Sequence, residues 1–245
     1  PATICISSDA YIEDMSGTYY DIIQDFKELL VDYLDNIFAI HNHKMSLQLQ
    51  GINVISRPGN KLESSTATGY ILEEYAIAAL SDYTKHKQNS KLLVLPAESA
   101  HASYDCYCIY KGIKFVINFK CAKGVNDGVA AIGKLVEDYC KSESLPKSYV
   151  VVKICYDFDG EANDRHISIK GYDTYALEEV DFSAGHKQDK RSWSGTSDLN
   201  AGRLQISDSF RRKHTAMPEN VSYENTCRQL LAIRDTNLAR DNQVR

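Results

Sequence analysis

The segment 104–120 constrains the fold more than any other part of the chain, because it reads as a β-hairpin. Two β-rich runs flank a Lys-Gly pair at 111–112, which is a turn signal. Side chains alternate between the two faces of a strand, so Asn118 and Lys120 are expected to point the same way. Asp105 opens the partner strand, and the hairpin brings it beside them. An acidic group, an amide oxygen and a lysine on one face suit Mg²⁺-assisted cleavage of a phosphodiester.

Helical and strand-like segments alternate around this hairpin. Apolar residues recur at helical spacing in four further segments, at 18–40, 67–85, 127–141 and 222–238. Shorter apolar runs predict strands at 92–95, 148–156, 166–170 and 203–206. This order predicts the α/β class, with a mixed central β-sheet flanked by helices. A right-handed crossover is the expected connection from the hairpin to the strand at 148–156.

The composition predicts one globular domain over residues 1–245. The chain has 43% hydrophobic and 25% charged residues, and no clear inter-domain linker. No apolar run is long enough to span a bilayer and no signal-peptide pattern is present, so no membrane partner is expected. Seven cysteines, mostly within apolar runs, indicate free thiols in a reducing cytoplasm. The glycines at 124, 128 and 133 fit no phosphate-binding fingerprint, so no nucleotide cofactor is expected.

Charge is distributed unevenly along the chain. The formal net charge is −5, which by itself argues against binding to nucleic acid. Residues 1–50 hold eight acidic residues against two basic ones, whereas residues 186–245 hold eleven basic residues against seven acidic ones. A basic C-terminal part can still place a positive surface against DNA. The alternative is an ordinary solvated surface.

The hairpin and its surroundings resemble the active-site core of the PD-(D/E)xK nucleases. Asp105, a spacer of twelve residues and Asn118-x-Lys120 resemble the signature of that superfamily. The helix that contains Glu73 and the elements that follow match its α-β-β-β-α-β order. The resemblance implies a restriction-endonuclease-like core over about 66–156.

The resemblance also implies a role for each site residue. Asp105 would bind Mg²⁺ and bridge it to the scissile phosphate. Asn118 and the backbone carbonyl of Phe119 would complete the protein ligands. Lys120 would orient or help to deprotonate the attacking water and offset phosphate charge. Glu73 would hold a metal-bound water or a second ion.

Two positions depart from the pattern. Tyr104 stands where the superfamily has proline, and Asn118 stands where it has Asp or Glu. An amide oxygen still ligates a hard cation but brings no charge, so weaker metal binding is expected unless Glu73 or Glu98 adds a carboxylate. Asn118 is either native or an inactivating substitution. The structural alternative is that Asp105 only opens a turn while Lys120 extends from a surface strand.

The C-terminal part, about 183–245, is the candidate DNA-recognition part. A long polar loop at 183–202 leads into a Gly-Arg-Leu-Gln-Ile run at 202–206, which loosely resembles the recognition segments of type II restriction endonucleases. Amide and guanidinium groups make bidentate contacts with base edges, whereas other cations position the protein on phosphates. The candidates for base contacts are Gln188, Arg191, Asn200, Arg203 and Gln205, and those for phosphate contacts are Lys187, Lys190, Arg211, Arg212 and Lys213.

The expected function is therefore that of a type II restriction endonuclease: Mg²⁺-dependent, sequence-specific cleavage of double-stranded DNA in a prokaryotic cytoplasm. A homodimer on a palindromic site is expected, with the helix at 18–40 as a reasonable dimerisation element. Two alternatives stay open. One is a DNA repair or junction-resolving nuclease with the same core. The other is a catalytically degenerate module that binds DNA or a partner, which the amide at Asn118 allows.

Overall fold

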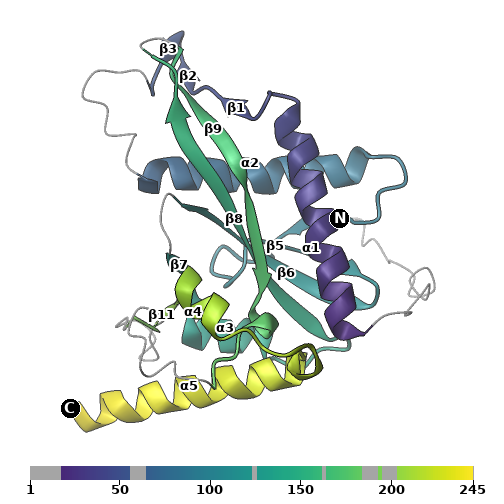
Figure 1. Cartoon of the computed structure of the whole chain (residues 1–245), viewed down its shortest axis with the longest axis vertical. Helices are drawn as coiled ribbons and strands as arrows, with labels where there is room; N and C mark the ends of the chain where they lie inside the picture. The colour runs from purple at the N-terminus through teal and green to yellow at the C-terminus, as the bar shows by residue number, and fades with distance from the viewer. Residues whose placement is uncertain are drawn as a thin grey trace.

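The computed structural model describes residues 18–55, 65–122, 126–161, 164–183, 193–194 and 203–244. Its centre is a curled, mixed sheet in the order β1-β9-β8-β6-β5-β4 (Figure 1). These strands are β1 Lys44–Met45, β4 Leu95–Pro96, β5 Cys106–Tyr110, β6 Ile113–Ala122, β8 Lys147–Asp159 and β9 His166–Ala176. Strands β6 and β8 are parallel, and the other neighbouring pairs are antiparallel.

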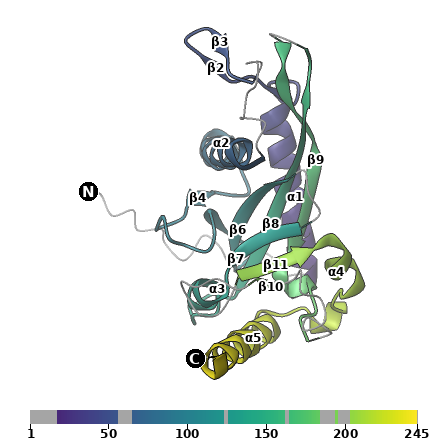
Figure 2. The same ribbon diagram turned by 90° about the vertical axis from the view of Figure 1, so that its left-hand side faces the viewer.

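Helices cover both faces of this sheet, and each face has its own apolar core. The long helices are α1 Tyr19–Ala39, α2 Ser65–His86 and α5 Tyr223–Val244, and the shorter α3 spans Ile132–Tyr139. Figures 1 and 2 show α2 and α5 near opposite ends of the curled sheet. The alternation along β6 serves both cores: Phe115 and Ile117 pack with α1 and α2, whereas Val116 packs with α3 and α5. The predicted fold class, a mixed sheet flanked by helices, is confirmed.

Smaller elements complete the described part of the chain. A three-stranded sheet has the order β10-β11-β7, and a two-stranded sheet pairs β2 with β3. The bounds are β2 Gln48–Leu49, β3 Ile52–Asn53, β7 Asn126–Ala131, β10 Trp193–Ser194 and β11 Arg203–Ser207. Three short helical segments are η4 Leu177–Glu179, α4 Asp208–Lys213 and η6 Pro218–Asn220.

The predicted helix at 127–141 is wrong in its first third. Residues 126–131 form β7, and the helix begins only at Ile132. The reason is tertiary: β7 pairs antiparallel with β11, far away along the chain, and this ladder satisfies its backbone groups. Gly128 favours the change, since glycine is among the poorest helix formers.

The strand predicted at 148–156 spans Lys147–Asp159, and two other strand predictions differ further from the structure. Of the predicted strand at 92–95 only Leu95 belongs to β4, while Leu92 and Val94 are buried without strand pairing. The strand predicted at 166–170 continues to Ala176. Gly171 has a φ of +148°, in the region that favours glycine, next to a register shift between β8 and β9. This bulge allows the pairing to continue past the expected end.

The apolar stripe of α1 packs inside the chain. Its buried residues are Ile22, Ile23, Phe26, Leu30, Tyr33, Leu34, Ile37 and Phe38. Thr18 caps the helix, because its hydroxyl accepts a hydrogen bond from the backbone N–H of Asp21. In return, the carboxylate of Asp21 accepts from the backbone N–H of Thr18. The stripe is thus used for the core of the same chain, and the expected homodimer stays a prediction. Among the described helices, none is both long enough and apolar enough to cross a bilayer.

Candidate functional site

The end of the β5–β6 hairpin places Asp105 against Asn118 and Phe119. The turn is tight, with φ of 44° at Lys111 and 74° at Gly112, as expected for this hairpin class. The backbone N–H of Asp105 donates to the carbonyl of Ile117 at 2.8 Å. Its carboxylate Oδ2 accepts from the backbone N–H of Phe119 at 2.6 Å. The carboxylate is therefore fixed by the strand that carries the other predicted residues.

Asn118 is almost fully buried, with 4% of its surface exposed. Its Nδ2 donates to the carbonyl of Ser103 at 2.9 Å and to the hydroxyl of Tyr149 at 3.0 Å. The Tyr149 hydroxyl itself donates to Ser103, so the amide orientation follows from the network. Asn118 Oδ1 is buried and has no hydrogen-bond partner within the described part of the chain. A buried acceptor in that state favours a cation or a water as its partner.

Lys120 lies near the end of β6, within electrostatic reach of two carboxylates. Its Nζ donates to the carbonyl of Phe119 at 2.6 Å, and the side chain is half-buried. Glu73 reaches the same place from α2, where its Oε1 accepts from the backbone N–H of Cys121 at 3.1 Å. Glu73 and Asp105 each interact electrostatically with Lys120. The structure thus brings Glu73, Asp105, Asn118 and Lys120 together, and we call these four residues with Phe119 the hairpin site.

The hairpin site contains two partly buried carboxylates, Asp105 and Glu73, and one lysine, Lys120. Burial raises the pKa of the Asp105 carboxyl above its usual range, against the opposing effect of Lys120. Burial likewise raises the pKa of Glu73, and the nearby charge of Asp105 adds to this rise. A bound divalent cation would reverse both effects, because it stabilises the ionised carboxylates.

The donor set suits a hard cation. Carboxylate, amide and carbonyl oxygens are the ligands that Mg²⁺ prefers, and the unpartnered Oδ1 of Asn118 supplies one of them. In the part of the chain that the structure describes, no group of three or more His, Cys, Asp or Glu side chains is arranged to hold a metal. Any ion would therefore depend on the amide and a backbone carbonyl in addition to Asp105 and Glu73. The Phe119 carbonyl would be shared with Lys120.

Glu98, the other carboxylate considered for this site, lies elsewhere. It is exposed, and its electrostatic partners are Tyr104 and Tyr107. Burial, followed by the charge of Glu98, raises the pKa of both tyrosines. Of these two carboxylates, Glu73 is thus the one whose charge interacts with Asp105, and the neighbouring Glu74 also raises the pKa of Asp105.

Two of the candidates for base contacts, Arg203 and Gln205, lie on β11. Arg203 is exposed and Gln205 is half-buried. Gln205 is the register partner of Gly128 on β7, and the guanidinium of Arg203 lies over the same glycine. Strand β7 follows β6 in the chain, so the three-stranded sheet that contains β11 is connected in sequence to the strand that carries Lys120.

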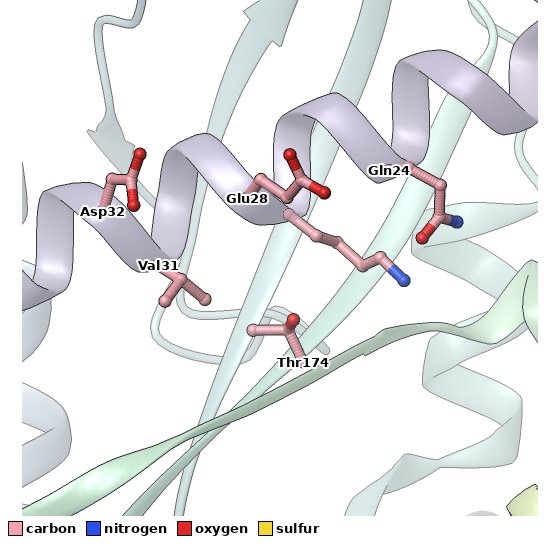
Figure 3. A pocket seen from close by; sticks show the side chains of 6 residues that line it. Gln24, Glu28, Val31, Asp32 and Thr174 are labelled. Carbon is pink, nitrogen blue, oxygen red and sulfur yellow. The ribbon is translucent and has the colours of Figure 1, made fainter.

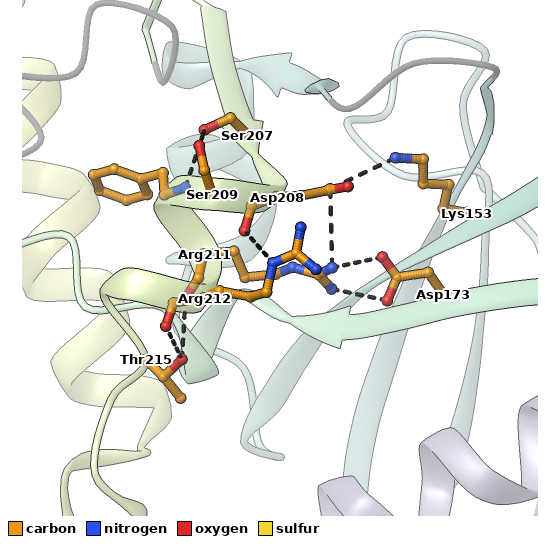
Figure 4. A network of polar contacts seen from close by, with 9 residues as sticks. Lys153, Asp173, Ser207, Asp208, Ser209, Arg211, Arg212 and Thr215 are labelled. Carbon is orange, nitrogen blue, oxygen red and sulfur yellow. Dashed lines mark hydrogen bonds and ion pairs between the residues drawn. The ribbon is translucent and has the colours of Figure 1, made fainter.

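Three of the candidates for phosphate contacts, Arg211, Arg212 and Lys213, form the last turn of α4. Arg212 and Lys213 are exposed. Arg211 differs, because its guanidinium donates to both carboxylate oxygens of Asp173, at 3.0 and 2.5 Å (Figure 4). The remaining candidates for DNA contact, Lys187, Gln188, Lys190, Arg191 and Asn200, lie outside the described residues.

Sequence reasoning missed Tyr149 and Lys153 on β8. Tyr149 donates and accepts beside Asn118, and Lys153 is the register partner of Lys120. The strand predicted at 148–156 is an apolar run, and its pattern gave no reason to select either residue as part of a site. The signal for Lys153 was its charge within an apolar run, since a buried lysine requires a partner.

A shallow polar hollow of about 480 Å³ lies between α1 and β9 (Figure 3). It is lined by Gln24, Lys27, Glu28, Val31, Asp32 and Thr174. Lys27 and Gln24 both donate to Glu179, at 2.6 and 2.8 Å. The hollow contains none of the residues of the hairpin site.

Comparison of the chain with models of known protein families finds no match, and comparison with curated proteins finds none either.

Proposed function

We propose that this chain is a Mg²⁺-dependent endonuclease of the PD-(D/E)xK type that cleaves double-stranded DNA at a specific sequence, as type II restriction endonucleases do. One observation carries the proposal. The hairpin fixes Asp105 against Phe119, while Lys120 bonds to the carbonyl of Phe119 and Glu73 accepts from the N–H of Cys121 at the same end of β6. Two carboxylates, a lysine and an orphan amide oxygen in one place suit hydrolysis of a phosphodiester better than a purely structural role.

The element order supports the same proposal. Helix α2, strands β4, β5 and β6, helix α3 and strand β8 follow one another in the α-β-β-β-α-β order, with β7 inserted before α3. The parallel pairing of β6 with β8 places Tyr149 beside Asn118. Glu73 stands on α2 and Asn118 and Lys120 stand on β6, whereas Asp105 lies immediately before β5.

The side chains divide the chemistry between them. Asp105, Asn118 and the Phe119 carbonyl would hold Mg²⁺, which when bound would supply a Lewis acid for the phosphate. The Phe119 N–H holds the Asp105 carboxylate in one orientation, which lowers the entropic cost of assembling the site. Lys120 offsets phosphate charge and orients the attacking water. The charge of Glu73 attracts the ammonium of Lys120 and so restricts its position.

Duplex DNA is the proposed substrate, read by a homodimer in which β11 presents Arg203 and Gln205. Side chains of this kind form bidentate contacts with guanine and adenine. The exposed Arg212 and Lys213 suit contacts with phosphates, which position a protein on DNA without selecting a sequence.

A plasmid cleavage assay with Mg²⁺ tests the proposal, with Lys120→Ala compared with wild type. Discrete bands that disappear in Lys120→Ala are expected. The matched control is Lys170→Ala, because Lys170 is an exposed lysine whose ion pair with Asp159 lies outside the hairpin site. Smeared products or a preference for branched DNA would favour the repair alternative. DNA binding without cleavage by any of the three proteins would favour the degenerate module, which the uncharged Asn118 allows.

A further inference from the structure

A row of charged side chains crosses the sheet at the level of Lys120. Lys120 of β6 is the register partner of Lys153 of β8, and Lys153 is the register partner of Asp173 of β9. Register partners on adjacent strands project from the same face of a sheet. The candidate catalytic lysine is thus the first member of a row that continues away from the hairpin site.

Helix α4 supplies the opposite charges to this row (Figure 4). Asp208 Oδ1 lies 3.6 Å from the ammonium of Lys153, and the guanidinium of Arg211 is bidentate with Asp173. Arg211 also lies 3.9 Å from Asp208 and stacks over the ring of Tyr175 at 4.5 Å from its centre. We call Lys153, Asp173, Asp208 and Arg211 the α4 network.

The α4 network is geometrically demanding. Only 4% of Lys153 is exposed, and a buried ammonium that loses its partner is strongly destabilising. The planar fork of arginine matches a carboxylate in one orientation only, so a lysine at position 211 would not reproduce it. The bidentate Arg211–Asp173 pair therefore orients α4 over β9, and the longer Asp208–Lys153 ion pair adds an attraction between α4 and β8.

Helix α4 follows β11 without a loop. The hydroxyl of Ser207, the last residue of β11, accepts from the backbone N–H of Phe210 and so caps the helix. Phe210 is buried in the core shared with α3 and α5. A displacement of β11 would consequently move Asp208 and Arg211, and with them the strands beside Lys120.

We propose that the α4 network is the joint that fixes the candidate base-reading strand β11 relative to the candidate catalytic strand β6. Asp208 and Arg211 are then positioning residues for cleavage, and Arg211 acts through Asp173 rather than through a DNA phosphate. This inference rests on the proposed nuclease function. It adds a physical connection between the part that reads duplex DNA and the part that cuts it.

The test compares Asp208→Asn and Arg211→Lys with wild type in three measurements. These are duplex affinity as a function of salt, the single-turnover cleavage rate, and hydrogen exchange of the amides of β11 and α4. We expect affinity within about threefold of wild type and an unchanged salt slope, because no phosphate contact is lost. The cleavage rate should fall roughly 100-fold, as small misplacements of reacting groups do. The amides of β11 should exchange faster.

The matched control is Asp159→Asn, which breaks the exposed Lys170–Asp159 ion pair between the same two strands. It should behave as wild type in all three measurements. The proposal is overturned if Arg211→Met weakens binding and lowers the salt slope by about one, since Arg211 would then contact a phosphate. It is also overturned if both network variants, folded by circular dichroism, cleave at the wild-type rate.

Failure of the proposed function can be distinguished from failure of the joint. If the wild-type protein cleaves no DNA, the nuclease proposal fails, but hydrogen exchange still reports on the α4 network. Unchanged exchange in β11 of Asp208→Asn would then reject the joint as well. Faster exchange in that variant and in Arg211→Lys, but not in Asp159→Asn, would support the joint as a structural connection.

Discussion

The buried carboxyl of Glu178 gives a prediction whose magnitude follows from the structure. Glu178 lies in η4 with 2% of its surface exposed. Its Oε1 accepts from the hydroxyls of Tyr139 and Tyr19, at 2.5 and 3.1 Å, and from the backbone N–H of Tyr149 at 3.1 Å. Burial raises the pKa of Glu178 from 4.5 to about 7, although these hydrogen bonds favour the ionised form. The residue therefore titrates near neutral pH in the folded protein.

The sign of the effect on stability follows from proton linkage. Between pH 4.5 and about 7 the folded protein keeps the proton on Glu178, whereas the unfolded chain releases it. The stability that comes from the raised pKa of Glu178 is fully present below the pKa of the unfolded chain. It is lost as the pH rises through the pKa of the folded protein. At about 1.4 kcal/mol per pKa unit, the loss amounts to about 3 kcal/mol.

Urea denaturation followed by circular dichroism at several pH values between 4.5 and 8 measures this effect. The variant Glu178→Gln keeps the shape of the side chain but cannot ionise, so it should not show the loss. The free energy of unfolding of wild type should fall relative to the variant by about 3 kcal/mol across this range. Glu73 and Asp105 titrate in both proteins and cancel in the difference. Parallel pH profiles of wild type and Glu178→Gln would refute the reasoning, and the exposed Glu137→Gln serves as control.

Two further predictions concern the hairpin site and α1. Asn118→Asp should destabilise the metal-free protein by roughly 1–3 kcal/mol, because a carboxylate cannot donate to the Ser103 carbonyl. Mg²⁺ should raise the Tm of this variant more than that of wild type, and equal Tm shifts would contradict the proposed ligand role of position 118. Thr18→Ala removes the capping hydroxyl of α1 and should cost about 1 kcal/mol in urea denaturation. An unchanged midpoint would mean that the cap contributes nothing.

The parts of the fold that were predictable from sequence are those set by local patterns. Apolar spacing located α1, α2 and α5, and the Lys-Gly turn located β5 and β6. Strand β7 was not predictable, because its backbone groups are satisfied by β11, which follows about 70 residues later. The continuation of β9 past Lys170 likewise depends on a bulge at Gly171 that pairing with β8 creates.

The same division holds for the candidate site. The spacing of Asp105, Asn118 and Lys120 along one hairpin made their proximity predictable, since strand alternation and a tight turn fix it. The position of Glu73 required the packing of α2 on β6, and the role of Lys153 required the register between β6 and β8. Both depend on contacts between segments far apart in the sequence, which the periodicity of a short window does not reveal.

The amide at position 118 is consistent with the charge balance around it. Burial already raises the pKa of Asp105 and of Glu73, with Lys120 as the cation that opposes both shifts. A carboxylate at 118 would add a third buried acid beside them and would face the carbonyl of Ser103. Asparagine removes this repulsion and keeps an oxygen for a cation, at the expense of attraction for the ion. If the chain cleaves DNA, its rate should therefore saturate at a higher Mg²⁺ concentration than that of Asn118→Asp, and a titration of Mg²⁺ in single-turnover cleavage measures the difference.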